Sequence, residues 1–516
     1  MMNTDHYDIP LFRGRNTICL NARRQTHKHM FTDNRPLVIQ GGMGPYVSTP
    51  FLARTTSMCG ALGTFSGVAA PLILIRILQR GDPGGHYRLA LSQFPYQEHV
   101  QPILDEYFVE GGIPMDTPFK MVSPYTLKPS RFLTSLTIVS TFSMAWLALY
   151  DENGIRHNGL ISVNFLEKMQ MPHIASFVGV MMAGVDCITM GAGIALQVPG
   201  ILDSLSQHGI GTYKIDVEGK KNSTQPMSFS WTEFFGTPFP GLKRPAFIPI
   251  ISSVSLGEVF LGKRATGASQ GAVLETSTAG GHNAPPRGRP VILNEFGEPV
   301  YGERDVADLH KMVALGIPIW IGGSYASPEL LQKVRAIGLA GIQVGTMFAL
   351  SRESGLAPQY THEARKQGFN NALRIRTDPQ ASPTGFPFKV APIAGTLYDT
   401  TVFDNRQRVC NQCYLRTLFV KEDDSIIYRC PAEPIDNYLR KNGTLEDAQN
   451  ARCLCNGLIA AAAIVAPGIT EPLSLGDVDE PAIITLGDDL SFLKHLMKDE
   501  NSTYSAATAL QYLMGS

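Results

Sequence analysis

The sequence predicts an α/β protein built on a (β/α)8 TIM barrel, with insertions and an additional C-terminal region. Apolar segments with strand character alternate with helical segments along the chain, which is typical of a parallel sheet. Several of the apolar segments end in glycine-rich turns. The chain has 516 residues and 44% hydrophobic content, so it can bury a large core and is longer than a plain barrel requires.

Eight short apolar segments are the predicted barrel strands. They are residues 36–40, 60–64, 160–165, 185–190, 246–252, 271–276, 317–321 and 341–345. Residues 136–141 are a ninth candidate for eight places. We place them outside the barrel, because the segment from Gly67 to Asn158 is too long for one connection. That segment is predicted to build a lid or an accessory layer over the barrel mouth.

The chain is predicted to divide into three parts. These are an N-terminal extension (1–35), the barrel (36–350) with insertions near 67–158 and 213–244, and a C-terminal extension (351–516). The second insertion is rich in Ser, Thr, Gly, Pro and aromatic residues, so we expect a hairpin between the fourth and fifth strands.

Two further segments have clear local signals. Ser327-Pro328-Glu329 supplies an N-cap, a first-turn proline and a first-turn acid, which predicts a helix over 330–337. Residues 376–389 contain several prolines and glycines and no helical period. They are most simply a surface loop, but a segment in this place could also fold back over the barrel mouth.

Three glycine-rich turns follow predicted strands in the second half of the barrel. Thr278-Ala-Gly-Gly-His-Asn283 places a histidine where glycines expose the backbone to a flat ligand. Ile317-Pro-Ile-Trp-Ile-Gly-Gly-Ser324 and Gly341-Ile-Gln-Val-Gly-Thr346 each end in glycine and a hydroxyl. Because loops after the seventh and eighth barrel strands commonly bind phosphate through unpaired N–H groups, we expect these two turns to hold one phosphate.

The N-terminal counterpart is Pro36-Leu-Val-Ile-Gln-Gly-Gly-Met-Gly44, an apolar strand that runs into a glycine-rich turn. With this element added, residues 36 to 350 resemble the nitronate monooxygenase family, once called 2-nitropropane dioxygenases, which are barrel enzymes that carry FMN. The family shares a first-strand Gly-Gly-Met-Gly turn, a later Ala-Gly-Gly-His motif and paired glycine-rich phosphate loops. All of these occur here in the same order.

The resemblance implies FMN as the cofactor and His282 as the catalytic acid or base, which we expect to titrate near neutrality. The residues implied to bind FMN are Gly42, Met43, Gly44, Asn164, Gly281, Gly322, Gly323, Ser324, Gly345 and Thr346. Met43 and its turn would contact the flavin ring, and the Asn164 amide would either bond the ring or cap its strand end. No G-x-G-x-x-G fingerprint follows the first strand, so FAD is not expected.

The implied reaction is oxidation of a small carbanion-forming substrate with oxygen, but the chain departs from the family pattern. The family usually has Gln-Gly-x-Glu before Ala-Gly-Gly-His, whereas Leu274-Glu-Thr-Ser-Thr278 stands here. Hydroxyls thus replace a flavin-contacting amide, and the acid stands three residues earlier.

A second difference follows the histidine, where Asn-Ala-Pro-Pro-Arg287 forms a rigid basic loop. One alternative function is therefore an FMN-dependent trans-acting enoyl reductase of polyketide or fatty acid biosynthesis that uses NADPH. Arg287 and Arg289 would then meet an anionic carrier arm, although surface charge is the simpler role for either alone. A flavin-binding scaffold without turnover is a second alternative.

The C-terminal region concentrates cysteine at Cys410, Cys413, Cys430, Cys453 and Cys455. Five thiols within 46 residues could close a zinc site or hold an iron–sulfur cluster. Their spacing matches no standard pattern, because Cys453 and Cys455 stand only one residue apart. Buried free thiols in a reducing compartment are the simpler interpretation, so no metal ligand is assigned.

Charge and hydropathy give no reason to propose nucleic acid or membrane as a partner. The formal net charge is −1. No secretory signal is visible over residues 1–24, which are polar and charged. The apolar stretches 136–150 and 174–202 are short or broken by Asp186 and glycines, so they read as buried elements. We expect a cytoplasmic enzyme that acts on a small-molecule substrate, either free or bound to a carrier. A homodimer is compatible with the sequence.

Overall fold

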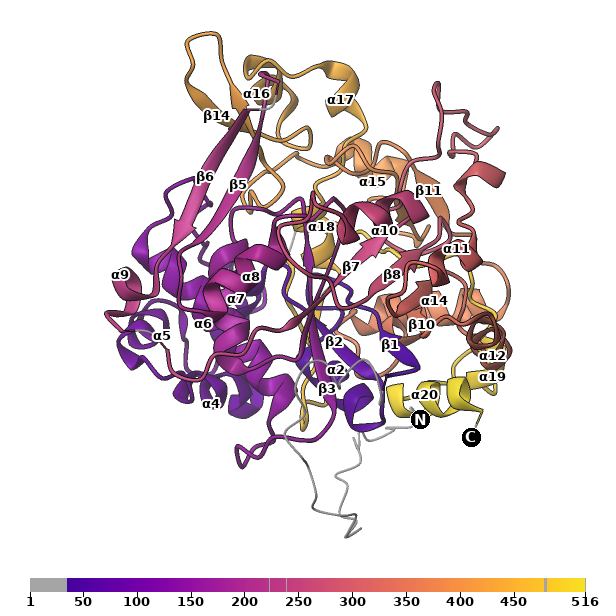
Figure 1. The fold of residues 1–516 in the computed structure, drawn as a ribbon, viewed down its shortest axis with the longest axis horizontal. Helices are drawn as coiled ribbons and strands as arrows, with labels where there is room; N and C mark the ends of the chain where they lie inside the picture. Colours follow the sequence, from indigo (N-terminus) through magenta and orange to yellow (C-terminus); the bar gives the residue numbers. More distant parts are fainter. Residues whose placement is uncertain (1–34, 222, 238, 478–479, 516) are drawn as a thin grey trace.

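The computed structural model describes residues 35–515 except 222, 238, 478 and 479 (Figure 1). The predicted N-terminal extension therefore lies outside the described residues, apart from its last residue. The division of the chain into three parts stays a prediction.

Eight parallel strands form a closed barrel, in the order β1-β10-β9-β8-β7-β4-β3-β2. The strands are β1 (Val38–Gln40), β2 (Leu62–Ser66), β3 (Leu160–Leu166), β4 (Cys187–Gly191), β7 (Ala246–Ile251), β8 (Ala272–Glu275), β9 (Ile319–Gly322) and β10 (Gly341–Val344). The barrel closes where β1 pairs with β10, with Ile39 opposite Gln343. Each strand overlaps a predicted one, so the predicted TIM barrel is confirmed.

Helices follow the barrel strands along the chain. They are α2 (Pro50–Met58), α7 (His173–Ala183), α8 (Val198–Ser206), α10 (Val254–Leu261), α11 (Leu309–Val313), α12 (Pro328–Ile337) and the short α13 (Thr346–Ala349). Helix α12 begins where its capping signal predicts, because the Ser327 side chain accepts a hydrogen bond from the Leu330 N–H.

The two faces of the strands belong to different cores. Val38, Leu274 and Ile321 pack in the large core that includes the surrounding helices. A separate cluster consists of the residues that alternate with these along the strands, and it fills the barrel interior. Its members are Ile39, Leu62, Cys187, Ala246, Ile248, Val273, Trp320 and Ala340. Because side chains alternate along a strand, Glu275 shares the inward face of Val273 and stands at its upper end.

The first insertion is a helical layer beside the barrel. It contains α3 (Ala70–Gln79), α4 (His86–Ser92), α5 (Gln101–Tyr107) and α6 (Arg131–Leu149), with short 3-10 turns at Pro83–Gly85 and Gln97–His99. Helix α6 packs against α2, α3, α4 and α7. The accessory layer is thus present, but it flanks the barrel and does not cover its mouth.

Residues 136–141, excluded from the barrel as a ninth strand candidate, lie in the middle of α6. This helix is long and apolar enough to cross a membrane, yet 89% of its apolar window is buried inside the protein. Neighbouring helices surround it, so the helix has no solvent-exposed face on which polar residues would be expected.

The second insertion is the predicted hairpin, formed by β5 (Gly211–Glu218) and β6 (Ser223–Phe229) and followed by α9 (Trp231–Phe235). Strand β5 also pairs in parallel with β13 (Thr417–Val420), which in turn pairs with β14 (Ile426–Arg429). The hairpin and the C-terminal region therefore share one four-stranded sheet (Figure 1, top).

The rest of the C-terminal region wraps around the barrel. Its other elements are α14 (Pro358–Phe369), β11 (Arg376–Asp378), β12 (Phe388–Val390), α15 (Thr400–Asn405), α16 (Ile435–Arg440), α17 (Leu445–Gln449), α18 (Leu454–Ala460), β15 (Ala463–Ile464), β16 (Leu473–Ser474), α19 (Leu493–Leu496) and α20 (Ala506–Met514). Buried residues from Val38 to Leu513 form one continuous hydrophobic core.

The segment 376–389 is not a surface loop. Its two ends form the antiparallel pair β11 and β12, and Phe388 is 2% exposed. Phe388 also bridges to His282. The segment therefore folds back onto the mouth of the barrel. This was the second of the two expectations, the first being a surface loop.

The five C-terminal cysteines are free thiols. The Sγ atoms of Cys410 and Cys413 lie 3.9 Å apart, while Cys430 and Cys453 are buried in a small apolar cluster against which Cys455 packs. Within the described residues, no group of three or more His, Cys, Asp or Glu side chains is arranged to hold a metal ion.

Candidate active site

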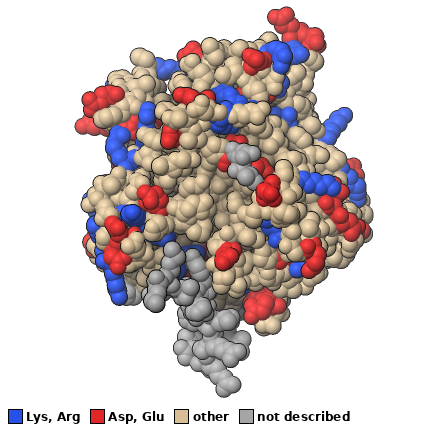
Figure 2. All heavy atoms as spheres, turned by 180° about the vertical axis from the view of Figure 1, so that it is seen from behind, with Lys and Arg blue, Asp and Glu red and all other residues tan. Residues whose placement is uncertain are grey.

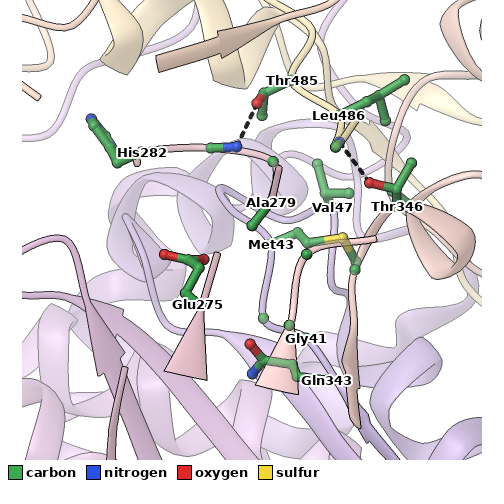
Figure 3. A pocket seen from close by; sticks show the side chains of 18 of the residues that line it. Gly41, Met43, Val47, Glu275, Ala279, His282, Gln343, Thr346, Thr485 and Leu486 are labelled. Atoms are coloured by element: carbon green, nitrogen blue, oxygen red, sulfur yellow. Dashed lines mark hydrogen bonds between the residues drawn. The ribbon is translucent and has the colours of Figure 1, made fainter. Parts of the chain in front are cut away.

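A cavity lies at the C-terminal ends of the barrel strands, and all of the predicted site residues border it. They are Gly42, Met43, Gly44, Asn164, Gly281, His282, Gly322, Gly323, Ser324, Gly345 and Thr346. In Figure 3, His282 and Glu275 lie on the left of the cavity, and Met43, Val47 and Thr346 lie on the right. The structure thus brings together four turns that are separated by up to 300 residues in sequence.

The turn after β1 packs closely against β3. A Cβ atom at Gly42 would lie 2.1 Å from the Cβ of Asn164, so no larger residue fits there. The Met43 N–H donates to Ser48 Oγ at 2.9 Å, which fixes the turn. Met43 extends from this turn toward the turn after β10, where its sulfur lies near Gly345.

The turns after β9 and β10 leave backbone donors unused. Gly323 has a φ of +95°, and a Cβ there would lie 2.1 Å from Thr276 Oγ1. The N–H groups of Ser324, Gly345 and Thr346 donate to no acceptor among the described residues. The Thr346 hydroxyl, expected at a phosphate, accepts a hydrogen bond from the Gly487 N–H at 2.8 Å.

Asn164 lies at the upper part of β3, and one side of its amide is already engaged. Its Oδ1 accepts from the Thr189 hydroxyl at 3.1 Å. Its Nδ2 has no described partner, and the residue borders the cavity. The amide is therefore oriented by β4 and keeps its donor for a ligand.

The Gly-Gly-His turn is held by the C-terminal region. Gly281 has a φ of +80°, which favours glycine. Its N–H donates to Thr485 Oγ1 at 2.8 Å, and its carbonyl accepts from the Lys389 N–H at 2.9 Å. The His282 ring meets the Phe388 ring edge-on at 4.8 Å. The backbone that carries His282 is thus fixed from outside the barrel.

The His282 imidazole is neutral at pH 7. Burial lowers its pKa from 6.5 to about 4, because desolvation disfavours the charged ring. The expected titration near neutrality is therefore wrong for this structure. Its Nε2 lies 2.8 Å from the Ser382 hydroxyl, and its Nδ1 has no described partner.

Several residues that border the cavity had not been predicted. They are Glu275, Gln343 and a C-terminal group that includes Phe388, Leu458, Ile483, Thr485, Leu486, Gly487, Asp489 and Phe492. Glu275 is the last residue of β8, and Gln343 is the residue before the last of β10, so strand alternation could have indicated them. The C-terminal residues have no local motif, and only the tertiary packing brings them to the barrel.

The lining of the cavity has no Lys or Arg within the described part of the chain. Arg287 and Arg289, considered for an anionic carrier arm, are exposed and do not border the cavity. Burial also raises the pKa of Glu275 to about 8. At pH 7 both His282 and Glu275 are therefore uncharged.

Comparisons with known proteins give structural neighbours only. No family model matches the chain, and a search of curated proteins finds no match. FabK from Thermotoga maritima is similar over 94% of this chain and 93% of its own, with 13% identity and a TM-score of 0.42. Nitroalkane oxidase from Streptomyces ansochromogenes is similar over 94% and 96%, with 12% identity and a TM-score of 0.42.

A third neighbour is the enoyl reductase domain of MlnA from the macrolactin biosynthesis cluster of Bacillus amyloliquefaciens. It is similar over 93% of this chain and 94% of its own, with 11% identity and a TM-score of 0.43. At these identities and TM-scores the likeness carries no argument about the activity of this chain. It does not choose between the two activities that the sequence left open.

Proposed function

We propose that this chain is an FMN-dependent oxidoreductase of the nitronate monooxygenase type, which oxidises a small carbanion-forming substrate with oxygen. The observation that supports it best is the convergence of four glycine-rich turns and His282 on one cavity. The cavity lies at the C-terminal end of the barrel, where TIM-barrel enzymes have their active sites.

The residues present fit FMN. The free N–H groups of Ser324, Gly345 and Thr346 lie in two turns that border the same cavity, and unpaired N–H groups bind phosphate. A Cβ at Gly281 would meet no atom within 4 Å, so there is open space beside this turn. Bound there, FMN would supply an acceptor for a hydride or electrons.

Two side chains would orient the flavin ring. The Nδ2 of Asn164 is a free donor at the cavity wall, and the Met43 thioether is a polarisable group that packs well against a ring. Neither group carries a charge, so both would position the ring by hydrogen bonding and packing alone.

His282 would act as the proton acceptor. When its Nε2–H donates to Ser382 Oγ, the Nδ1 lone pair is left free, and no described group competes for it. Because the ring is neutral at pH 7, it can take a proton from a carbon next to an electron-withdrawing group without first losing its own. Ser382 would hold the ring in this tautomer.

The lining also favours an uncharged substrate. Within the described residues, no Lys or Arg faces the cavity to pair with a permanent anion. A neutral carbon acid such as a nitroalkane satisfies this condition, and its charge develops only as His282 removes the proton.

A second candidate is an enoyl reductase that uses NADPH. Apolar side chains from the C-terminal region, including Leu356, Leu458, Ile483 and Phe492, border the cavity. Such a lining suits an acyl chain next to a reducible double bond. NADPH would then be the reductant, and the double bond of the substrate would be the group that is reduced.

Anaerobic reduction of the purified flavoprotein separates the two activities. We expect nitroalkanes to bleach the flavin absorbance in stopped-flow measurements, and NADPH to leave it unchanged on the same timescale. Rapid bleaching by NADPH followed by reoxidation with an enoyl thioester would contradict the monooxygenase proposal and support the reductase. A flavin that neither compound reduces would contradict both and support a scaffold.

A further inference from the structure

Cys410 and Cys413 lie in one turn of the C-terminal region, and neither borders the cavity at the barrel mouth. They flank Asn411 and Gln412 in the irregular segment that leads to β13. Their Sγ atoms are 3.9 Å apart, and Cys413 Sγ also lies 3.5 Å from the Cys410 carbonyl oxygen. The turn thus brings two thiols into direct contact.

The backbone of this turn holds the contact in place. Cys413 has a φ of +61°, a conformation that costs free energy for residues other than glycine unless the surroundings stabilise it. A disulfide holds its sulfur atoms about 2.05 Å apart, so rotation of the two side chains about their Cα–Cβ bonds can close the remaining gap. The two cysteines are therefore positioned to form a disulfide without a change of fold.

The two thiols are not equivalent. The hydrogen bond from Cys410 is the main cause that lowers the pKa of the Cys413 thiol. The positive charges of Arg416 and Lys441 lower this pKa further, whereas burial and the carboxylate of Glu433 act in the opposite direction. Because the thiolate is the reactive form of cysteine, Cys413 is the nucleophile of the two. Cys413 is only 8% exposed, so the oxidant that reaches it has to be small.

We propose that Cys410 and Cys413 form a reversible redox pair, which a small hydroperoxide oxidises to a disulfide. The Cys413 thiolate attacks the peroxide, so that an S–O bond forms, the O–O bond breaks and hydroxide leaves. The Cys410 thiol then attacks the sulfenic acid on Cys413. An S–S bond forms, the S–O bond breaks and the second oxygen leaves as water.

Overall, the two thiols lose two electrons and two protons, and one hydrogen peroxide becomes two water molecules. A dithiol reductant reverses the reaction by thiol–disulfide exchange. The inference does not depend on the proposed function, because the redox pair contains no residue of the flavin cavity.

Hydrogen peroxide added to the reduced full-length protein tests the redox pair. The remaining free thiols are alkylated, and peptides are mapped by mass spectrometry. We expect one disulfide, between Cys410 and Cys413, that dithiothreitol removes. Cys59, an exposed thiol at the C-terminal end of α2, is the internal control and should form no disulfide within the chain.

Two variants test the order of the steps. Cys410→Ser should stop the reaction at a sulfenic acid on Cys413, which dimedone labels. Cys413→Ser should leave Cys410 reduced, with a rate of peroxide consumption at least about tenfold lower, because the thiolate is lost. A sulfenic acid that instead accumulates on Cys410 in Cys413→Ser at the parent rate would overturn the assignment of Cys413 as the nucleophile.

The peptide map of the parent protein decides the proposal without any variant. Cys430, Cys453 and Cys455 interact electrostatically with Cys410 and are the competing partners. A disulfide from Cys410 or Cys413 to one of these thiols would overturn the pairing. Thiols that all stay alkylatable after peroxide treatment would overturn the redox role. Oxidation that begins only after a chelator removes a stoichiometric metal ion would also overturn it, because the thiols would then be metal ligands.

Discussion

The chemistry that we propose for the site depends on His282, whose environment the sequence could not specify. The Gly-Gly-His motif placed the residue on the cavity, as the structure has it. Burial lowers its pKa, and the Phe388 ring that packs against it lies about 100 residues further along the chain. A prediction from local sequence therefore finds the residue but not its protonation state.

Removing the imidazole should abolish most turnover and leave the flavin bound. His282→Ala keeps all four glycine turns, whereas the proton acceptor is lost, so we expect a loss of about 10²- to 10⁴-fold in the reductive rate. Stopped-flow reduction at several pH values measures this, with FMN occupancy as the control. An alanine variant that reduces its flavin as fast as the parent would make His282 a structural residue.

The low pKa of His282 also predicts how stability depends on pH. The folded pKa, about 4, lies below the ordinary value of 6.5. The stability tied to the neutral ring is therefore present above pH 6.5 and is lost as the pH falls toward 4. In the apoprotein, the denaturation midpoint of His282→Gln should therefore fall less than that of the parent between pH 6.5 and 4. If parent and variant midpoints fall in parallel between pH 6.5 and 4, the ring is not buried as a neutral group.

Ser382 should act on the reaction only through His282. Its hydroxyl lies 2.8 Å from Nε2, so Ser382→Ala frees the ring to rotate and change tautomer. We expect about a threefold to tenfold lower reductive rate with unchanged FMN occupancy, the usual worth of one hydrogen bond. Ser92→Ala on the exposed face of α4 is the control. A reductive rate equal to that of the control would show that Ser382 does not hold the ring.

At the scale of elements, the strands were predictable and the insertions only partly so. All eight barrel segments carry apolar runs that end in turn signals, and each became a strand. Residues 136–141 have the same apolar character but continue into a longer apolar stretch, which is helix α6. An apolar run does not by itself distinguish a buried strand from a buried helix.

The turn after β10 offers a clean test of the phosphate site. Gly345 has an ordinary φ of −107°, and a Cβ there would lie 3.6 Å from the Met43 sulfur, so small side chains fit. Gly345→Asp should place a negative charge beside the free N–H groups and raise the Kd for FMN at least 100-fold, or about 3 kcal/mol. Gly345→Ala should bind FMN nearly as the parent does.

Equal FMN affinity in the two Gly345 variants, measured by fluorescence titration of folded apoprotein, would show that the phosphate binds elsewhere. Gly323 is less suitable for this test, because its φ of +95° and the contact with Thr276 would strain any substitution.

At the scale of the whole molecule, the C-terminal region could not be positioned from sequence. It has no motif that refers to the barrel, yet it supplies Thr485 and Gly487 to the Gly-Gly-His and β10 turns. Basic and acidic side chains are intermingled on the face shown in Figure 2, in line with the net charge of −1. The absence of nucleic-acid or membrane partners and the oligomeric state stay predictions.

The continuous core predicts that the barrel and the C-terminal region unfold together. The three tryptophans, Trp146, Trp231 and Trp320, precede residue 350, whereas the buried thiols of Cys430 and Cys453 follow it. Cys187 is a buried thiol of the barrel, so labelling has to be followed at Cys430 and Cys453 separately, by mass spectrometry of peptides. Tryptophan fluorescence and labelling of these two thiols should then give coincident denaturant midpoints. Labelling that saturates at lower denaturant than the fluorescence change would show that the C-terminal region opens independently.

The central claim is that this cavity binds FMN, and the flavin released from purified protein tests it most directly. Two turns with free N–H groups offer a cradle for one phosphate, and the first strand has no dinucleotide fingerprint. Mass spectrometry of the denatured yellow protein should therefore identify FMN in near one-to-one ratio. Recovery of FAD, or a colourless protein that takes up no FMN on reconstitution, would contradict the account.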